Sequence, residues 1–176
     1  ESEKSVHWYF EVVCPTMKVL IIDDEEDFRT VASSCLGLLA GAEVIEAGSG
    51  QEGIDLACAE KPDVILMDLC MPGMDGTQTL TNLRKHSEVS DVPVIFCTTV
   101  GMFEQFEEMK KIGALAVITK PFDPLRLGDQ INSILTTAGR MNSDGTMIPA
   151  ASKRGDVKLV VTDSNSQSEA EAEDKT

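Results

Sequence analysis

Four short apolar runs recur along this chain of 176 residues, and polar residues do not interrupt them. The runs cover residues 19–22, 64–67, 94–96 and 114–118, and residues 42–47 form a weaker fifth candidate. Uninterrupted runs of this length are typical of strands that are buried on both faces of a parallel sheet. Helical stretches separate the runs, so the sequence predicts an α/β fold in which five parallel strands alternate with five helices in a doubly wound sheet.

Local signals place the helices between these strands. The stretch 27–40 carries an apolar side made of Phe28, Val31, Cys35, Leu38 and Leu39. Ser49 and Glu52 have the spacing of a capping box ahead of a helix that runs to Lys61.

Two further signals frame the last predicted strand. Gly113 fits a left-handed cap that closes the helix before this strand. Asp123 and Pro124 predict the start of the last helix, because Asp accepts the first unpaired amides and Pro has no amide hydrogen to lose.

Composition divides the chain into three parts. Residues 17–137 hold the alternating pattern and form the predicted domain. Residues 1–16 precede a Met17 that resembles a natural start, and we expect them to be a disordered or artefactual extension. Residues 138–176 are rich in small and polar residues and hold too few apolar ones to order themselves, so we expect a disordered tail. Within that tail, residues 157–162 could form a short strand.

Charge and cysteine content exclude several classes of function. The net charge is −15 and no Lys/Arg-rich stripe is present, which argues against direct nucleic-acid binding. No apolar run reaches the ~18 residues needed to span a membrane, and the N-terminus lacks the layout of a secretory signal, so we expect a cytoplasmic protein. The five cysteines show no C-x-x-C spacing and no nearby histidines, which favours reduced thiols over disulfides or a zinc site.

Acidic residues and one lysine follow the ends of three predicted strands. Asp23 and Asp24 follow the first strand, Asp68 follows the run at 64–67, and Lys120 follows the last. Ligands of doubly wound sheets bind where the carboxyl ends of the strands meet. Three carboxylates gathered there would repel one another without a cation, and an all-oxygen set with room for water suits Mg²⁺. Asp68 could then act as a nucleophile toward a phosphoryl group.

The motifs around these residues resemble those of the receiver domain of two-component response regulators, over residues 17–137. The acidic pair stands in VLIIDDEED, the acceptor region in DVILMDLCMPGMDG, the hydroxyl region in PVIFCTT and the lysine region in VITKPF. The spacing agrees, since Asp68 lies 44 residues after Asp24, Thr98 lies 30 after Asp68 and Lys120 lies 52 after Asp68. The resemblance implies a flavodoxin-like sheet with the strand order 2-1-3-4-5.

The resemblance also implies a role for each site residue. Asp68 would accept a phosphoryl group from the phosphohistidine of a sensor histidine kinase. Thr98 and Lys120 would bind the phosphoryl oxygens. The Mg²⁺ ligands would be Asp23, Asp24, Asp68 and the backbone carbonyl of Cys70. A receiver of this kind catalyses only its own phosphorylation and dephosphorylation, so we do not expect an enzyme with a separate substrate.

The resemblance carries two expectations about the backbone of the site. Lys120–Pro121 would be a cis peptide bond. Met71-Pro72-Gly73 and Gly76 would form the loop that shapes the site.

The chain departs from the family pattern at two places. Val117 stands where many members carry Tyr or Phe as a rotameric switch, and a valine side chain cannot swing between buried and exposed positions. Cys70 and Val100 offer no acid or amide side chain to orient a water that attacks the phosphoryl group. We therefore expect slow spontaneous dephosphorylation.

One helix suggests a surface for partners. In the stretch 102–112, the apolar side chains spread over about half the circumference at ~100° per residue, which is wider than a sheet-packed helix needs. We expect Phe106 and Val117 to share a face for an unknown downstream protein or for phosphorylation-dependent dimerisation of a monomer. Residues 138–176 show no pattern typical of a DNA-binding or enzymatic module, so we expect a receiver that acts through protein contacts.

Two alternatives stay open. The chain could be a receiver fragment of a hybrid histidine kinase, because SVHWYFEV upstream faintly resembles the strand that ends a kinase ATP-binding domain. A more distant alternative is a haloacid-dehalogenase-like phosphohydrolase, which also forms an aspartyl-phosphate with Mg²⁺. That family places its nucleophile after the first strand with a second aspartate two residues on, where Asp68 has Cys70.

Overall fold

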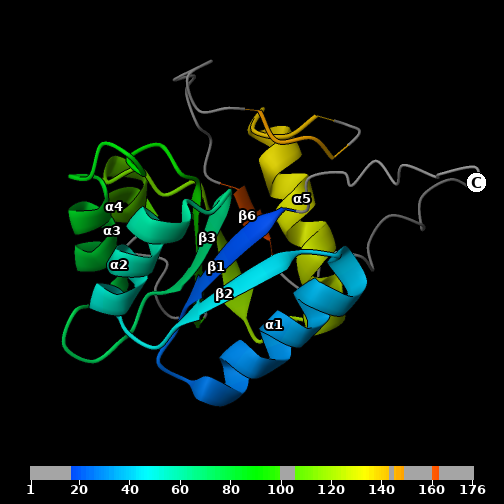
Figure 1. Ribbon diagram of the computed structural model, residues 1–176, viewed down its shortest axis with the longest axis horizontal. Coiled ribbons are helices and arrows are strands. Elements are labelled where there is room, and N and C mark those ends of the chain that lie inside the picture. The colour runs from blue at the N-terminus through cyan, green and yellow to red at the C-terminus, as the bar shows by residue number, and fades with distance from the viewer. Residues whose placement is uncertain (1–16, 100–105, 143–144, 149–159, 163–176) are drawn as a thin grey trace, which may run out of the picture.

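The computed structural model describes residues 17–99, 106–142, 145–148 and 160–162 (Figure 1). The strands in this part of the chain are β1 (Lys18–Ile22), β2 (Glu43–Ala47), β3 (Val64–Asp68), β4 (Val94–Thr99), β5 (Ala116–Lys120) and β6 (Val160–Thr162). The helices are α1 (Glu26–Ala40), α2 (Gly50–Glu60), α3 (Gly76–Leu83), α4 (Phe106–Lys111) and α5 (Leu127–Thr137), with a 3₁₀ turn η2 (Pro124–Arg126) before α5.

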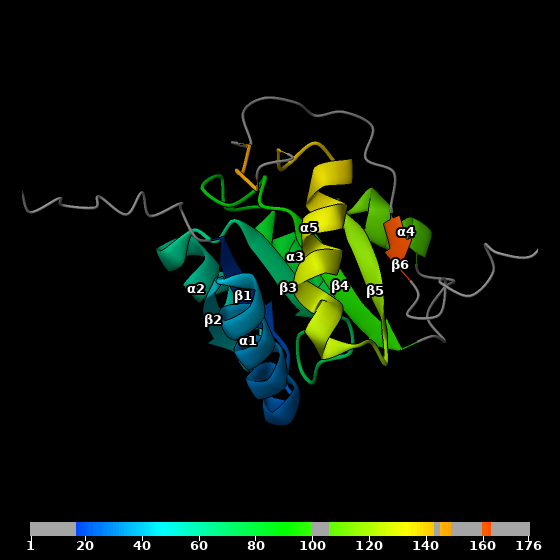
Figure 2. The ribbon, with the colours of Figure 1, turned by 90° about the vertical axis from the view of Figure 1, so that its right-hand side faces the viewer.

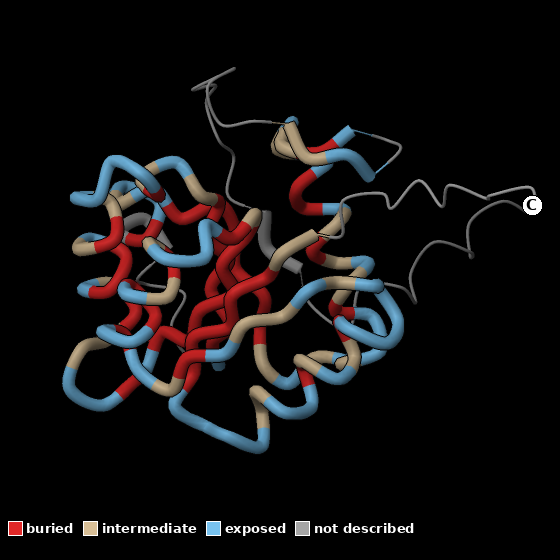
Figure 3. Tube along the Cα trace, viewed as in Figure 1, coloured by how far each residue is buried: buried red, intermediate tan, exposed pale blue. Residues whose placement is uncertain are grey.

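All strand pairs in the sheet are parallel, and the order is β2-β1-β3-β4-β5-β6. The predicted five-stranded order 2-1-3-4-5 and the five helices are therefore confirmed. Helices α1 and α5 cover one face of the sheet, while α2, α3 and α4 cover the other (Figures 1 and 2). The strands β1, β3, β4 and β5 are buried almost throughout, as their uninterrupted apolar runs require, whereas β2 is largely exposed or half-buried (Figure 3).

Successive residues of one strand enter opposite cores. In β1, Val19 and Ile21 pack toward α1 and α5, whereas Leu20 and Ile22 pack toward the layer of α2, α3 and α4. This alternation follows from the two-residue period of a strand. It gives the sheet two separate apolar contacts, which fix both helix layers and so hold the carboxyl ends of the strands in place.

The predicted apolar side of α1 is confirmed for Phe28, which packs against the core, but it is wrong for three other residues. Val31, Leu38 and Leu39 were expected on the packed side, but they are 48%, 85% and 62% exposed. The fully buried side chains of this helix are Ala32 and Leu36. The helix lies close to α5, where a Cβ added to Gly128 would be only 2.8 Å from Ala40 Cβ. The packed side is therefore centred on Ala32 and Leu36, and Leu38 and Leu39 lie outside it.

The predicted helix boundaries are confirmed at two places, and a third is shifted. The Ser49 side chain accepts a hydrogen bond from the Glu52 amide, while the Glu52 carboxylate accepts one from the Gly48 amide. Gly113 adopts φ +89°, the left-handed conformation expected after α4. Asp123 accepts a hydrogen bond from the Leu125 amide, but it caps the turn η2 and α5 begins only at Leu127.

The strand β6 lies in the segment that we expected to be disordered, within the short run at 157–162 that composition singled out. It pairs in parallel with β5, so that Val160 faces Ala116 and Thr162 faces Ile118 (Figure 2). An unpaired strand edge is a template for association with other chains. The β6 segment therefore covers part of the β5 edge from within the same chain.

We expect removal of residues 157–176 to leave the five-stranded sheet folded and to speed hydrogen exchange in β5. The reason is that β6 supplies the hydrogen-bonding partner of this edge over three residue pairs. Hydrogen exchange followed by mass spectrometry would compare peptides from β5 with peptides from β1, which is flanked by β2 and β3 and serves as the internal control. Unchanged protection of β5 in the shortened chain would contradict this assignment.

Candidate functional site

Three charged side chains meet at the carboxyl edge of the sheet. Asp23 follows β1 directly, Asp68 is the last residue of β3, and Lys120 is the last residue of β5. Since β3 lies beside β1 in the parallel sheet, and only β4 separates β3 from β5, the ends of these strands fall on the same edge of the sheet. The structure thus brings together three of the residues that the sequence predicted for the site.

Lys120 joins the two buried carboxylates. Its ammonium Nζ donates hydrogen bonds to Asp23 Oδ2 at 2.9 Å and to Asp68 Oδ1 at 2.8 Å. Asp23 is 1% exposed and Asp68 is 8% exposed, so the ammonium neutralises charge that water hardly reaches. Charge-assisted hydrogen bonds of this length are stronger than neutral ones.

Asp23 is held by nearby backbone groups and by Arg29 as well as by Lys120. Its Oδ1 accepts a hydrogen bond from the Glu25 amide at 2.9 Å, and its amide donates to the Ala47 carbonyl at the end of β2. Arg29 Nη1 donates to the Asp23 backbone carbonyl at 2.7 Å. These contacts fix the orientation of the Asp23 carboxylate, whose Oδ2 accepts the hydrogen bond from Lys120.

Asp68 is held equally closely, and its surroundings leave little room. Its Oδ2 accepts a hydrogen bond from the Cys70 amide at 2.7 Å. The chain then turns through residues 71–75 into α3, and the Gly76 amide donates to the Leu69 carbonyl. A Cβ at Gly76 would lie 2.5 Å from the Asp68 backbone carbonyl and 2.9 Å from Leu69 Cα. Only glycine fits this close approach.

The pKa values of Asp68 and Lys120 are both raised, as expected where two carboxylates share one cation. Burial raises the pKa of Asp68, and the nearby Asp23 raises it further, although Lys120 and the Cys70 amide lower it in part. Burial alone would lower the pKa of Lys120, but the hydrogen bonds to Asp68 and Asp23 outweigh it and raise this pKa above its usual value. The ammonium therefore stays charged, and one cation serves two buried carboxylates.

The other predicted site residues lie nearby in different settings. Asp24 and Cys70 are exposed at the rim, next in sequence to Asp23 and close after Asp68. Thr98 is 4% exposed and sits one residue beyond Cys97, the residue of β4 that pairs with Asp68. Lys120–Pro121 is a cis peptide bond, as expected.

The Mg²⁺ ligand set expected from the sequence stays a prediction. No group of three acidic, histidine or cysteine side chains close enough to hold a metal ion is found among the described residues. Asp23 and Asp68 each accept a hydrogen bond from Lys120, while Asp24 is exposed.

The structure corrects one residue of the predicted partner face. Val117 is fully buried in the core between the sheet and the layer of α2, α3 and α4, so its side chain cannot contact a partner directly. Met109 of α4 is also fully buried. Phe106 begins α4, but its side chain lies outside the described residues, as do Val100, Met102 and Phe103.

Two residues beside the site were not predicted to serve it. Arg29 fixes the backbone of Asp23, and the ring of Phe28 lies against the Lys120 ammonium at 4.2 Å from ring centroid to Nζ. Phe28 was assigned to the apolar side of α1 on periodicity alone. Phe28 lies four residues after the acidic pair. This spacing would point to a role at the site only if the start of α1 at Glu26 were already known.

Known proteins are similar to this chain in sequence and fold over about two thirds of its length. The sequence matches the family described as response regulator receiver domain over residues 19–132. Protein PilH of Pseudomonas aeruginosa is 38% identical over 118 residues, which are 67% of this chain and 97% of that protein. The structure of the chemotaxis protein CheY4 of Vibrio cholerae is similar with a TM-score of 0.64 at 33% identity, covering 68% of this chain and 99% of that chain. This chain belongs to the response regulator receiver family.

The receiver matches only part of some longer relatives. The probable transcriptional regulator ycf27 of Porphyridium aerugineum is 33% identical over 130 residues, which are 74% of this chain and 52% of that protein. The chain thus spans about half the length of several curated relatives. Among the helices that the structure describes, none is long and apolar enough to cross a membrane.

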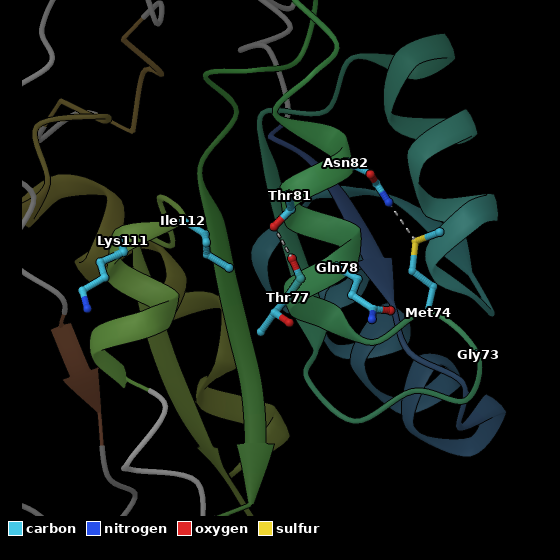
Figure 4. A pocket seen from close by; sticks show the side chains of 8 residues that line it. All are labelled: Gly73, Met74, Thr77, Gln78, Thr81, Asn82, Lys111 and Ile112. Atoms are coloured by element: carbon cyan, nitrogen blue, oxygen red, sulfur yellow. Dashed lines mark hydrogen bonds between the residues drawn. The ribbon is translucent and has the colours of Figure 1, made fainter.

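An open groove of about 760 Å³ lies apart from the charged site of the receiver (Figure 4). It runs between α3 and α4, and its lining consists of Gly73, Met74, Thr77, Gln78, Thr81, Asn82, Lys111 and Ile112. None of the three residues that meet at the carboxyl edge belongs to this lining. The charged residues at the carboxyl edge are therefore not part of this groove.

We expect Gly76→Ala to destabilise the receiver by about 1–3 kcal/mol, because the new methyl group would overlap the Asp68 and Leu69 backbone. Gly37→Ala in α1 is the matched control. Its nearest atom would be the Ala42 carbonyl at 3.9 Å, and alanine favours a helix over glycine by up to about 1 kcal/mol. Urea unfolding with unchanged m-values measures both variants. Equal stability of the two would show that the approach at Gly76 is not tight.

Proposed function

We propose that this receiver accepts a phosphoryl group on Asp68 from the phosphohistidine of a sensor histidine kinase. The observation that carries the proposal is the double hold on the Asp68 carboxylate, with Lys120 on Oδ1 and the Cys70 amide on Oδ2. A carboxylate that is fixed and partly desolvated, with a cation beside it, is prepared for nucleophilic attack on an electrophile that brings further negative charge.

The proposed transfer balances without a further reactant. A carboxylate oxygen of Asp68 forms a bond to phosphorus while the phosphorus–nitrogen bond of the phosphohistidine breaks. The imidazole leaves with the bonding electron pair, and the product on the receiver is a mixed acyl phosphate. Lys120 is placed to bind a phosphoryl oxygen, since its ammonium already reaches Asp68. Thr98 would donate its hydroxyl to another oxygen.

The donors at the site fit Mg²⁺. This ion takes oxygen ligands, keeps several waters and is usually held by only one or two carboxylates. Asp23 and Asp68 share a single ammonium, so the charge balance favours a further cation, and the exposed Asp24 carboxylate lies on the side open to water. We propose Asp23, Asp24, Asp68 and the Cys70 carbonyl as its ligands. When bound, Mg²⁺ would supply neutralising charge for the transferred phosphoryl group.

The site favours a receiver over a phosphohydrolase with a separate substrate. The phosphohydrolase alternative needs a second carboxylate two residues after its nucleophile, and Cys70 occupies that position. Burial and the neighbouring Asp68 raise the pKa of the Cys70 thiol, so it does not replace that acid. We therefore propose a phosphoacceptor that signals through protein contacts, with α4 as the element nearest to an output surface.

If Asp68 is the acceptor, a small phosphodonor should phosphorylate the receiver at this residue. Acetyl phosphate with Mg²⁺ should add one phosphoryl group to the receiver, and Asp68→Asn should abolish this addition because an amide is a poor nucleophile. Asp55→Asn, on the exposed surface of α2, is the matched control and should label normally. Intact-mass spectrometry with and without EDTA reads the result. Undiminished labelling of Asp68→Asn would contradict the assignment of Asp68 as the acceptor.

The lifetime of the acyl phosphate should respond to Cys70. Cys70 is exposed at the rim, two residues after Asp68, so a carboxylate there could orient an attacking water. We expect Cys70→Glu to lose its phosphoryl group several-fold faster than the unaltered receiver, while Cys70→Ala should lose it at the unaltered rate. A tenfold difference would correspond to about 1.4 kcal/mol in the barrier. Equal decay of all three proteins would mean that Cys70 only fills space.

A further inference from the structure

The ammonium of Lys120 has a third neighbour besides its two carboxylates. Its Nζ lies 4.2 Å from the centroid of the Phe28 ring. A cation within about 6 Å of a ring centroid is attracted by the negative face of the ring. Phe28 belongs to the first turns of α1, whereas the carboxylates follow β1 and end β3, so the ring approaches the ammonium from a separate element.

The Phe28 ring is itself held in place. It packs edge to face against Phe122, with ring centroids 5.7 Å apart and an angle of 88° between the planes. Phe122 follows Lys120 by two residues, and both rings are partly buried against the core under α1 and α5. Edge-to-face packing fixes the orientation of an aromatic ring beyond what burial alone does. The aromatic pair therefore ties the start of α1 to the chain just after β5.

We propose that Phe28 is a positioning residue that holds the Lys120 ammonium over the site while its hydrogen-bonding partners change. The proposal rests on the phosphoacceptor function proposed above. When a phosphoryl group is on Asp68, Lys120 must shift at least one N–H from a carboxylate to a phosphoryl oxygen. The ring face attracts the ammonium but carries no net charge, so it competes neither for the phosphoryl oxygens nor for a hard cation.

This role separates Phe28 from the surrounding apolar side chains. A leucine at position 28 would fill similar space against Phe122 but would offer no negative face to the ammonium. The carboxylates of Asp23 and Asp68 attract Lys120 more strongly than the ring does, yet they are the groups whose interactions change during transfer. The ring is the one contact of the ammonium, among those that the structure describes, that can persist unchanged.

Stepwise fluorination of the ring tests the proposal with almost no change in shape. Phenylalanines that carry one, two or three fluorine atoms, placed at position 28 alone, withdraw charge progressively from the ring face. We expect the rate of labelling by acetyl phosphate with Mg²⁺ to fall with each fluorine, by roughly three- to tenfold over the series. Phe28→Leu should lie at the low end and Phe28→Trp should restore the rate. The control is the same series at Phe96, which is fully buried in the opposite core.

A second readout needs no phosphorylation. The ¹³C relaxation of the Lys120 ε-methylene group, measured in the receiver that carries no phosphoryl group, reports how well the ammonium is held. We expect this order to drop in Phe28→Leu and to remain in Phe28→Trp. A labelling rate independent of fluorination, or unchanged Lys120 order in Phe28→Leu, would overturn the positioning role. An unaltered receiver that cannot be labelled would instead refute the phosphoacceptor function, and the Lys120 order would still decide whether Phe28 holds the ammonium.

Discussion

The arrangement of the whole site depends on one ammonium shared by two buried carboxylates. Asp23 and Lys120 lie 97 residues apart in the chain, and Asp68 and Lys120 lie 52 apart, yet all three groups meet within hydrogen-bonding distance. Removing the lysine would leave two carboxylates without a counter-ion in a setting that water hardly reaches, which is strongly unfavourable. The sheet order places these residues together, and the ion pairs in turn hold the ends of β1, β3 and β5 in register.

The parallel topology explains why the sequence was informative about this site. Each apolar run ends where its strand ends, and in a parallel sheet all such ends fall on the same edge. Asp23, Asp68 and Lys120 could therefore be placed together without any knowledge of side-chain contacts. The position of Thr98 follows from the same argument, because β4 lies between β3 and β5. The metal ligand set stays a prediction, since the strand ends place its residues on one edge without saying that Lys120 contacts two of the carboxylates.

Periodicity predicted the existence of α1 but not its orientation. Leu38 and Leu39 are the most apolar residues of its last turns, and a search for a wide apolar stripe selects them. The helix instead buries Ala32 and Leu36, and its end approaches Gly128 of α5 at Ala40. The β6 strand shows a similar limit. Composition marked the run at 157–162, but its pairing with β5 rather than with β2 follows from the crossover through α5.

The contact between Lys120 and Phe28 shows how a partner exchange can be built into a rigid site. The two carboxylates hold the ammonium by charge, and an arriving phosphoryl group changes the charge on one of them. A site held by carboxylates alone would have its lysine least constrained while those contacts exchange, when its position matters most. An aromatic ring that is fixed by Phe122 gives a weaker attraction, but one that the arriving group does not alter. The weakest of the three contacts is thus the one best suited to guide Lys120 through the change.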